Sequence, residues 1–292
     1  MAQKVLILGN SGTGKSASLR NFEEKEIEVI SCAGKPLPFK NHFTTHTPSY
    51  QHLTADVLNA MGRCFKPVLV IDDAQYIMSF QYMRRIHENG WDKWNDIQSD
   101  FFAVIQACEL LPENTIVYFL SHLQKDEDGL ETIKTMGKML DSKITIEGLF
   151  TTVLKTNVSD GKYYFLTQNN GKDTVKSPIG MFETYAIDND LKYVDTKIRN
   201  YYEIGEHASD EEVKAMDEEH AAPEVEKPDV EGRKRRRRKA KDEAKDEQEE
   251  KQSETPSEEA GEEKPKRRRR KKREPEPVED DSDLPFTMSE EG

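Results

Sequence analysis

The sequence is poor in cysteine and has no long apolar run. Its cysteines, Cys32, Cys64 and Cys108, are far apart and form no C-x-x-C pair. This spacing argues against a disulfide framework or a zinc knuckle and favours a reducing compartment. No apolar stretch approaches the length of a membrane span, and the N-terminus lacks the basic-then-apolar layout of a signal peptide. We therefore expect a soluble intracellular protein without a membrane partner.

A metal centre built from histidines is not expected either. His42 and His46 have the i,i+4 spacing of a helical metal site, but the segment around them is β-branched and ends at Pro48. An ordinary loop is the preferred interpretation.

The C-terminal third of the chain has hardly any aromatic residues. The 292-residue chain has a formal net charge of -13, and apolar residues recur at structural spacings only up to about Tyr202. The remainder is dominated by Glu, Lys, Arg, Asp, Ser and Pro, a composition that cannot build a packed core. We predict a globular domain over residues 1–205 and a disordered, charged tail over residues 206–292.

Within the globular part, short apolar runs alternate with amphipathic segments. Strands are expected over residues 4–8, 26–30, 67–73 and 115–122, and helices over residues 16–22, 51–64 and 91–111. This alternation predicts an α/β fold with a mostly parallel sheet and helices on both faces. A later pair of alternating runs around Asp160 and Gly161 predicts an antiparallel hairpin that extends the sheet. A last helix, with Asp188 or Asp190 as its cap, is expected before Tyr202.

The first predicted strand leads directly into the sequence GNSGTGKS, residues 9–16. It satisfies the pattern G-x-x-x-x-G-K-[ST], with a strand before it and a helix after it, which is typical of a loop that wraps the phosphates of a nucleotide. Lys15 is expected to reach the β- and γ-phosphates of ATP, and the Ser16 hydroxyl to ligate Mg²⁺. The alternative is a glycine-rich turn that only joins strand to helix. The predicted nucleotide-binding residues are Gly9, Asn10, Ser11, Gly12, Thr13, Gly14, Lys15, Ser16 and Ala17.

Polar residues at the ends of two further strands complete the predicted site. Asp72 is the expected second Mg²⁺ ligand, because that ion takes few protein oxygens and keeps several waters. Asp73 is expected to orient or deprotonate the attacking water. The alternative for this pair is N-capping of a helix that begins at Ala74. His122, at the end of another strand, is predicted to sense the γ-phosphate, although a solvated strand end is an equal alternative.

The spacing from the phosphate loop to VLVIDDAQ and then to YFLSH resembles that of RecA-type ATPases. More narrowly, the segments GKPLPFK, VIDDAQYIM, KTMGKML, EGLFTTVL and VKSPIGMFE resemble RecA-like ATP-binding proteins of bacteriophage recombination and replication clusters, including the Sak-type single-strand annealing ATPases. The resemblance covers residues 3–203, with the phosphate loop and Asp72 as its highly specific motifs. It implies a RecA-like P-loop fold, DNA-stimulated ATP hydrolysis, homo-oligomers on single-stranded DNA and a place in the host bacterial cytoplasm.

The same resemblance implies a cation that reaches the ATP of a neighbouring subunit. Lys172 and Lys176 occupy a comparable place after the late hairpin. Such a cation neutralises charge on the transferred phosphoryl group. Ring helicases generally have an arginine beside the lysine, whereas this chain has Ser177, and two ordinary surface lysines are an equal alternative.

The tail contains two basic blocks, RKRRRRKAK from Arg233 and KPKRRRRKKR from Lys264. They predict salt-dependent backbone contacts to nucleic acid. The alternatives are a self-neutralising, solubilising tail and, formally, a nuclear import signal. The ending EDDSDLPF resembles the tip with which bacterial single-stranded-DNA-binding proteins dock on replication partners, but residues follow Phe286, and a chance acidic ending is the alternative.

The main hypothesis is an ATPase that binds single-stranded DNA and promotes annealing or strand pairing. An ATP-controlled helicase loader, whose tail recruits a single-strand-binding or other replication protein, is the first alternative. A small-molecule phosphotransferase is less favoured, since the core has only the adjacent pair Arg84 and Arg85 and no arginine cluster for a lid.

Overall fold

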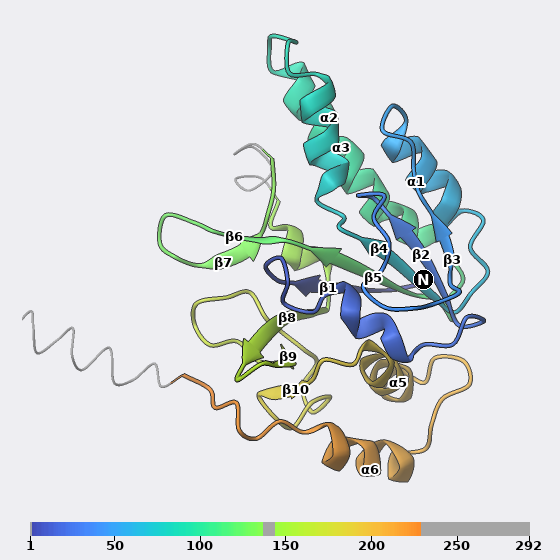
Figure 1. Ribbon diagram of the computed structural model, residues 1–292, viewed down its shortest axis with the longest axis vertical. Helices are drawn as coiled ribbons and strands as arrows, with labels where there is room; N and C mark the ends of the chain where they lie inside the picture. Colours follow the sequence, from blue (N-terminus) through green and yellow to red (C-terminus); the bar gives the residue numbers. More distant parts are fainter. Residues whose placement is uncertain (1, 137–143, 229–292) are drawn as a thin grey trace, which may run out of the picture. The chain divides into compact units, whose positions relative to one another are not determined.

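The computed structural model describes residues 2–136 and 144–228 of the chain, and Figure 1 shows their arrangement. At its centre is an eight-stranded sheet with the order β10-β9-β8-β1-β5-β4-β2-β3. Its strands are β1 (Gln3–Leu8), β2 (Ile27–Ser31), β3 (Thr44–His46), β4 (Val68–Asp72), β5 (Ile116–Ser121), β8 (Thr152–Ser159), β9 (Lys162–Leu166) and β10 (Ala186–Asp188). A separate two-stranded sheet pairs β6 (Leu123–Lys125) with β7 (Glu131–Ile133).

Most neighbouring strands of the large sheet run parallel. β1 pairs in parallel with β5 and β8, β4 with β5 and β2, and β2 with β3. Only β9 reverses the direction, because it pairs antiparallel with both β8 and β10. The turn between β8 and β9 contains Asp160 and Gly161 at φ values of 50° and 77°, which is the pair of positive φ angles that a type I′ turn requires. The predicted α/β class, mostly parallel sheet and antiparallel extension are confirmed.

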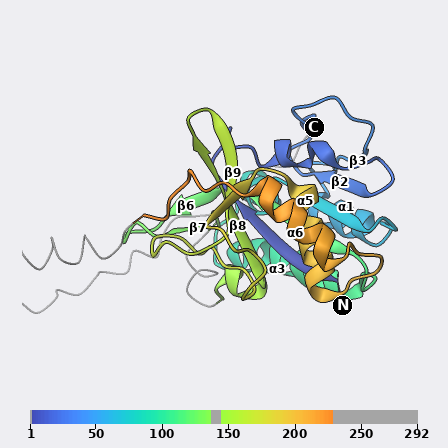
Figure 2. The same ribbon diagram turned by 90° about the horizontal axis from the view of Figure 1, so that it is seen from below.

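Helices cover both faces of the sheet (Figures 1 and 2). Successive side chains of a strand point to opposite faces, and β1 illustrates the result. Leu6 and Leu8 pack in the core formed with α1 (Leu53–Met61), α2 (Tyr76–Arg84) and α3 (Asp92–Ala107). Val5 and Ile7 belong to the opposite core, which includes residues of η1 (Ser16–Asn21) and α5 (Leu191–Tyr202). The strand is thus apolar on both faces, as a central parallel strand must be. Two shorter elements, η2 (Cys108–Leu110) and η3 (Ile146–Leu149), are 3-10 helices.

The helix expected after the phosphate loop is a short 3-10 helix. η1 covers only Ser16–Asn21. The Ser18 hydroxyl donates to the Lys15 carbonyl at 2.6 Å, so that this side chain competes with the backbone amides that an α-helix would use. Asn21 is also a weak helix former. A helix therefore follows the loop as predicted, but it is of the 3-10 type and ends one residue early, so a helix dipole contributes little here.

Ordered structure continues past residue 205, where the composition predicts a disordered tail. α6 (Asp210–His220) begins with a capping box, in which Ser209 and Glu212 satisfy each other's backbone amides. Its Asp217 accepts hydrogen bonds from the Tyr193 hydroxyl at 2.6 Å and from Lys197 at 2.7 Å, both on α5. Figure 2 shows the two helices side by side. Residues 206–228 are thus part of the folded unit, while both basic blocks and the acidic ending lie outside the described residues.

Of the two residues predicted to cap the last core helix, Asp188 and Asp190, the structure has Asp190 as the N-cap. Its carboxylate accepts from the backbone amides of Lys192 and Tyr193 at the start of α5. Within residues 2–136 and 144–228, no helix is both long and apolar enough to cross a bilayer.

Candidate functional site

The carboxyl ends of β1, β4 and β5 lie next to one another, because these three strands are parallel neighbours. The phosphate loop follows β1, Asp72 and Asp73 stand at the end of β4, and His122 follows β5. The topology therefore brings the residues predicted from three separate motifs to one edge of the sheet. Polar residues at such an edge are the usual place for a ligand in open α/β sheets.

The conformation of the phosphate loop depends on its glycines. Gly12 and Gly14 have φ values of 77° and 95°, a region that residues with a Cβ rarely adopt. Gly9 is required for another reason. A Cβ at this position would lie 1.8 Å from Oγ1 of Thr156 on β8. Thr156 Oγ1 also lies 2.6 Å from Oγ1 of Thr13, so the loop packs directly against the neighbouring strand.

The amine of Lys15 lies inside the curve of the loop. Its Nζ donates to the carbonyls of Gly9 and Asn10, both at 2.9 Å, and the residue is only 6% exposed. Burial lowers the pKa of Lys15 to about 8, although Asp73 and Asp72 oppose the shift. A buried ammonium with only carbonyl partners gains strongly from an anion, as the predicted phosphate contact requires.

Ser16 and Asp72 are in direct contact. The Ser16 hydroxyl lies 2.9 and 3.1 Å from the two carboxylate oxygens of Asp72. Burial, followed by repulsion from Asp73, raises the pKa of Asp72 to about 6. A desolvated carboxylate beside a hydroxyl offers hard oxygen donors, the kind of ligand that Mg²⁺ prefers. These two side chains would hold the ion that the phosphate loop implies.

Asp73 has an unusual backbone and two charged neighbours. Its φ is 58°, in the left-handed region, a conformation uncommon outside glycine that often marks a functional position. Its carboxylate forms an ion pair with Lys35 and lies 3.5 Å from Nε2 of His122. The helix-cap alternative is not supported, since α2 is capped by Gln75 without a side-chain hydrogen bond.

His122 is held in place through its backbone. Gln75 Oε1 accepts from the His122 amide at 3.1 Å and from the Ser121 hydroxyl at 3.3 Å. Partial burial and the positive charge of Lys15 lower the pKa of His122, so its ring is neutral at pH 7. A neutral imidazole can either donate or accept a hydrogen bond at the edge of the site.

Several of these residues line one cavity of about 350 Å³, whereas Asp72 lies behind Ser16 and outside its lining. Its lining comprises Ser11, Gly12, Gly14, Lys15, Ser16, Ala17, Lys35, Pro36, Pro38, Asp73, His122 and Tyr163. Sequence reasoning identified most of the phosphate loop, Asp73 and His122, but it assigned no role to Lys35 or Tyr163. Lys35 belongs to the segment GKPLPFK, which resembles phage RecA-like proteins but contains no motif that predicts a role for this lysine. No sequence motif predicts a role for Tyr163, since only the pairing of β9 with β8 brings it to the loop.

The two lysines considered for action on a neighbouring subunit lie elsewhere. Neither Lys172 nor Lys176 lines the cavity of its own chain. Lys176 exchanges both backbone hydrogen bonds with Val153 at 2.8 and 2.9 Å, and Lys172 follows a turn that includes Gly171. Their action in trans stays a prediction.

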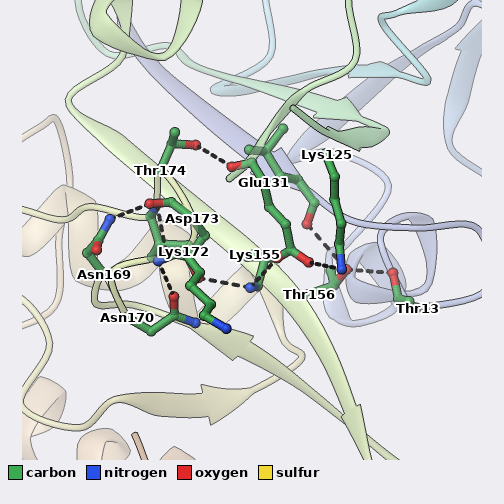
Figure 3. A network of polar contacts seen from close by, with 12 residues as sticks. Thr13, Lys125, Glu131, Lys155, Thr156, Asn169, Asn170, Lys172, Asp173 and Thr174 are labelled. Atoms are coloured by element: carbon green, nitrogen blue, oxygen red, sulfur yellow. Dashed lines mark hydrogen bonds and ion pairs between the residues drawn. The ribbon is translucent and has the colours of Figure 1, made fainter. Parts of the chain in front are cut away.

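A network of polar contacts borders the site on the β8 side (Figure 3). Lys155 donates to Glu131 at 2.7 Å and to Asp173 at 2.8 Å. The next residue of the strand is Thr156, which contacts Thr13 of the phosphate loop. Adjacent residues of β8 therefore contact the phosphate loop and the β6–β7 sheet.

A second, larger cavity of about 690 Å³ lies near the amino ends of β4 and β5, away from this edge. Its cations are already paired. Arg199 binds Asp195 and the carbonyls of Asn114 and Pro67, and Lys192 pairs with Glu26. Lys192 and Arg199 both hold α5 on the sheet through these contacts, so the smaller cavity is the better candidate for a charged ligand.

Comparisons with known proteins give no family. No family model matches the sequence, and no curated protein matches it. Among solved structures the chain is similar to a KaiC-like protein from the hyperthermophilic archaeon Pyrococcus horikoshii, with 15% identity and a TM-score of 0.35 over 56% of this chain and 78% of that one. It is also similar to a DnaB-like replicative helicase, with 11% identity and a TM-score of 0.37 over 64% of this chain and 55% of that one. Similarity at this level does not identify a function.

Proposed function

We propose that the chain is a Mg²⁺-dependent ATPase that acts on single-stranded DNA, promoting annealing or strand pairing as a homo-oligomer in bacteriophage DNA metabolism. The observation that carries the ATPase assignment is the contact between Ser16 and Asp72 beside the buried amine of Lys15. These three side chains come from a phosphate-loop motif and from a strand more than fifty residues away. Their convergence is what a triphosphate with its cation requires.

Several residues of the site have a role in this proposal. Backbone amides of the loop, from Gly12 to Ser16, bind phosphate oxygens. Lys15 leaves its two carbonyl partners and binds the terminal phosphates, while Ser16 and Asp72 hold Mg²⁺, which neutralises phosphate charge. Asp73 orients the attacking water, and His122 lies where it can contact the terminal phosphate.

The base of the nucleotide has a candidate partner in Tyr163. Its side chain lines the cavity and is 48% exposed. An aromatic ring that is open on one side offers a stacking surface for a purine. Because every purine has such a surface, Tyr163 supports nucleotide binding without selecting adenine over guanine.

Single-stranded DNA is proposed as the partner on the basis of the family resemblance and the two basic blocks of the tail. Each lysine or arginine that neutralises a phosphate releases a counterion, so binding through these blocks weakens as salt is raised. The division of labour between core and tail can be tested by truncation after residue 228, since α6 belongs to the folded unit.

The deciding experiment measures ATP hydrolysis with and without a single-stranded oligonucleotide, at low and raised salt. The full-length chain, the chain ending at residue 228 and the Lys15→Ala variant are compared. We expect DNA to stimulate hydrolysis by the full chain and Lys15→Ala to abolish it. Hydrolysis by Lys15→Ala at the normal rate would overturn the site assignment. Stimulation by a nucleoside in place of DNA would favour a phosphotransferase. The cavity argues against that alternative, because none of the described residues that line it is an arginine.

Strand annealing by the chain ending at residue 228 distinguishes the main proposal from a helicase loader. If the core itself anneals DNA, this activity survives the truncation. A loader that recruits its partner through the tail loses its function in the same variant.

A further inference from the structure

The loop that follows β2 brings a second lysine into the nucleotide cavity. Gly34, at a φ of 66°, closes a tight turn in which its amide donates to the Ser31 carbonyl at 3.1 Å. The Ser31 hydroxyl in turn donates to the Lys35 carbonyl at 3.1 Å. Pro36 and Pro38 then restrict the backbone and line the cavity themselves. Lys35 is therefore placed at the cavity by a constrained loop.

The ion pair between Lys35 and Asp73 is asymmetric. The Asp73 side chain is 2% exposed, whereas that of Lys35 is 53% exposed. Partial burial disfavours the charge of Lys35, but the hydrogen bond to Asp73 and the negative charges of Asp73 and Asp72 together outweigh it and raise the pKa of the amine. The carboxylate is fixed in the protein, while the ammonium on its flexible stem is free to turn toward the cavity.

Two ammonium groups line the cavity, and the carboxylate of Asp72 lies beside it in contact with Ser16. The ammonium groups of Lys15 and Lys35 both line it, and Asp73 is the one carboxylate in its lining. The two amines also repel each other, since Lys35 contributes to the lowered pKa of Lys15. A polyphosphate removes this repulsion, because each amine gains anionic oxygens as partners.

We propose that Lys35 is a second phosphate-binding cation, which leaves Asp73 for the terminal phosphate of ATP when the nucleotide binds. This inference rests on the proposed function and adds a regulatory role to the same site. Lys35 is the candidate for the terminal phosphate because it contacts Asp73, the neighbour of the Mg²⁺ ligand Asp72. Its departure leaves the Asp73 carboxylate free to accept a hydrogen bond from water.

If Lys35 moves in this way, the chain supplies a second cation to the ATP that it binds itself. Before ATP binds, Lys35 occupies the carboxylate that is proposed to orient the attacking water. Only a nucleotide with a γ-phosphate offers Lys35 a better partner. ADP, which lacks that phosphate, leaves the ion pair with Asp73 intact, so the site distinguishes the two nucleotides by charge at one position.

The test is equilibrium binding of fluorescent ribose-labelled ATP and ADP in EDTA, so that the readout depends on neither Mg²⁺ nor turnover. Lys35→Met is compared with the wild type, with Lys35→Arg and with Lys40→Met. Lys40 belongs to the same loop but does not line the cavity, so its substitution is the matched control. We expect Lys35→Met to weaken ATP binding by at least about tenfold, the effect of losing one charge-assisted hydrogen bond. ADP binding should change by no more than about twofold, and Lys35→Arg should retain most of the affinity for ATP.

The double variant Lys35→Met/Asp73→Asn tests whether the ion pair between Lys35 and Asp73 only stabilises the fold. The single variant leaves Asp73 buried without its partner and lowers the stability of the fold, whereas the double variant removes this charge. If the double variant also binds ATP weakly and ADP normally, Lys35 itself contacts the terminal phosphate. Full recovery of ATP affinity in the double variant would overturn the inference, as would equal losses for ATP and ADP in Lys35→Met. Failure of the wild type to bind either nucleotide, both in EDTA and with Mg²⁺ added, would instead overturn the proposed function, and the inference with it.

Discussion

The hydroxyl of Ser16 lies within hydrogen-bonding distance of both carboxylate oxygens of Asp72, at 2.9 and 3.1 Å. The two residues belong to motifs on β1 and β4, strands that are not neighbours, since β5 lies between them. Their contact arises because the phosphate loop and η1 extend across the end of β5. The hydroxyl is the partner of a carboxylate whose pKa burial has raised to about 6.

Asp72→Asn tests this relationship. The amide keeps the size of the side chain but removes the negative charge that attracts Mg²⁺, so we expect Mg²⁺-dependent ATP hydrolysis to fall by at least about 100-fold. The measurement is the hydrolysis rate over a series of Mg²⁺ concentrations. Asp56→Asn, on α1 and outside the cavity lining, is the control and should hydrolyse ATP like the wild type. A normal Mg²⁺ dependence in Asp72→Asn would show that the ion is held elsewhere.

Gly9→Ala tests the packing of the phosphate loop on β8. A Cβ at residue 9 would lie 1.8 Å from Thr156 Oγ1 and 2.7 Å from Thr13 Oγ1, so the loop or the strand must move. Overpacking of this kind typically costs about 1–3 kcal/mol, and we expect ATP binding to weaken at the same time. Thr156→Ala removes the closer oxygen and should restore part of both losses in the double variant. Chemical denaturation and nucleotide titration measure the two effects; simple additivity of the two substitutions would mean that they do not share this contact.

The sequence predicted the parallel sheet and the phosphate loop well because both are encoded locally. The apolar runs of β1, β4 and β5 and the glycines of the loop are visible in single segments. Lys35 and Tyr163 were not predicted, since their approach to the loop depends on pairing between distant segments. The 3-10 type of η1 was not predicted, because periodicity does not reveal the side-chain hydrogen bond of Ser18. The capping box of Ser209 and Glu212 is a local sequence pattern, but α6 was not predicted because the charged composition around it is typical of a disordered tail.

Lys155→Met tests the network beside the phosphate loop. The side chains of Lys155 and Asp173 are 12% and 1% exposed, and Glu131 shares the same cation. Removing the Lys155 ammonium leaves two carboxylates without their cation, and the loss of one partner of a buried ion pair typically lowers the free energy of unfolding by about 3–5 kcal/mol. Lys125→Met is the matched control, because Lys125 contacts Glu131 only from a largely exposed position; its effect should stay within about 0.5 kcal/mol. The measurement is the free energy of unfolding, and equal effects of the two variants would contradict the burial argument.

His122 predicts a pH dependence of stability. Its pKa is lowered by burial and by Lys15, with further repulsion from Lys35 and Lys134 and attraction from Asp73. The folded state thus binds fewer protons at this residue than the unfolded state, and the resulting cost is fully present below the folded pKa and disappears above about 6.5. Relative to His122→Asn, the wild type should gain stability as the pH rises toward that value. Denaturation of both proteins at several pH values measures the difference, and an opposite slope would mean that the ring is preferentially charged in the fold.

The final prediction concerns where the folded unit ends. Lys197 is 7% exposed and its ammonium is paired with Asp217 of α6. Truncation after residue 205 removes this carboxylate and leaves the buried amine without its partner, together with the Tyr193 hydroxyl that donates to the same carboxylate. We expect the chain ending at residue 205 to be less stable than the chain ending at residue 228 by about 3 kcal/mol, the cost of one unpaired buried charge. Asp217→Asn in the longer chain should reproduce most of this loss without removing α6. Thermal and chemical unfolding of the three proteins would decide the matter, because a chain ending at residue 205 with undiminished stability would make α6 an appendage of the domain rather than part of it.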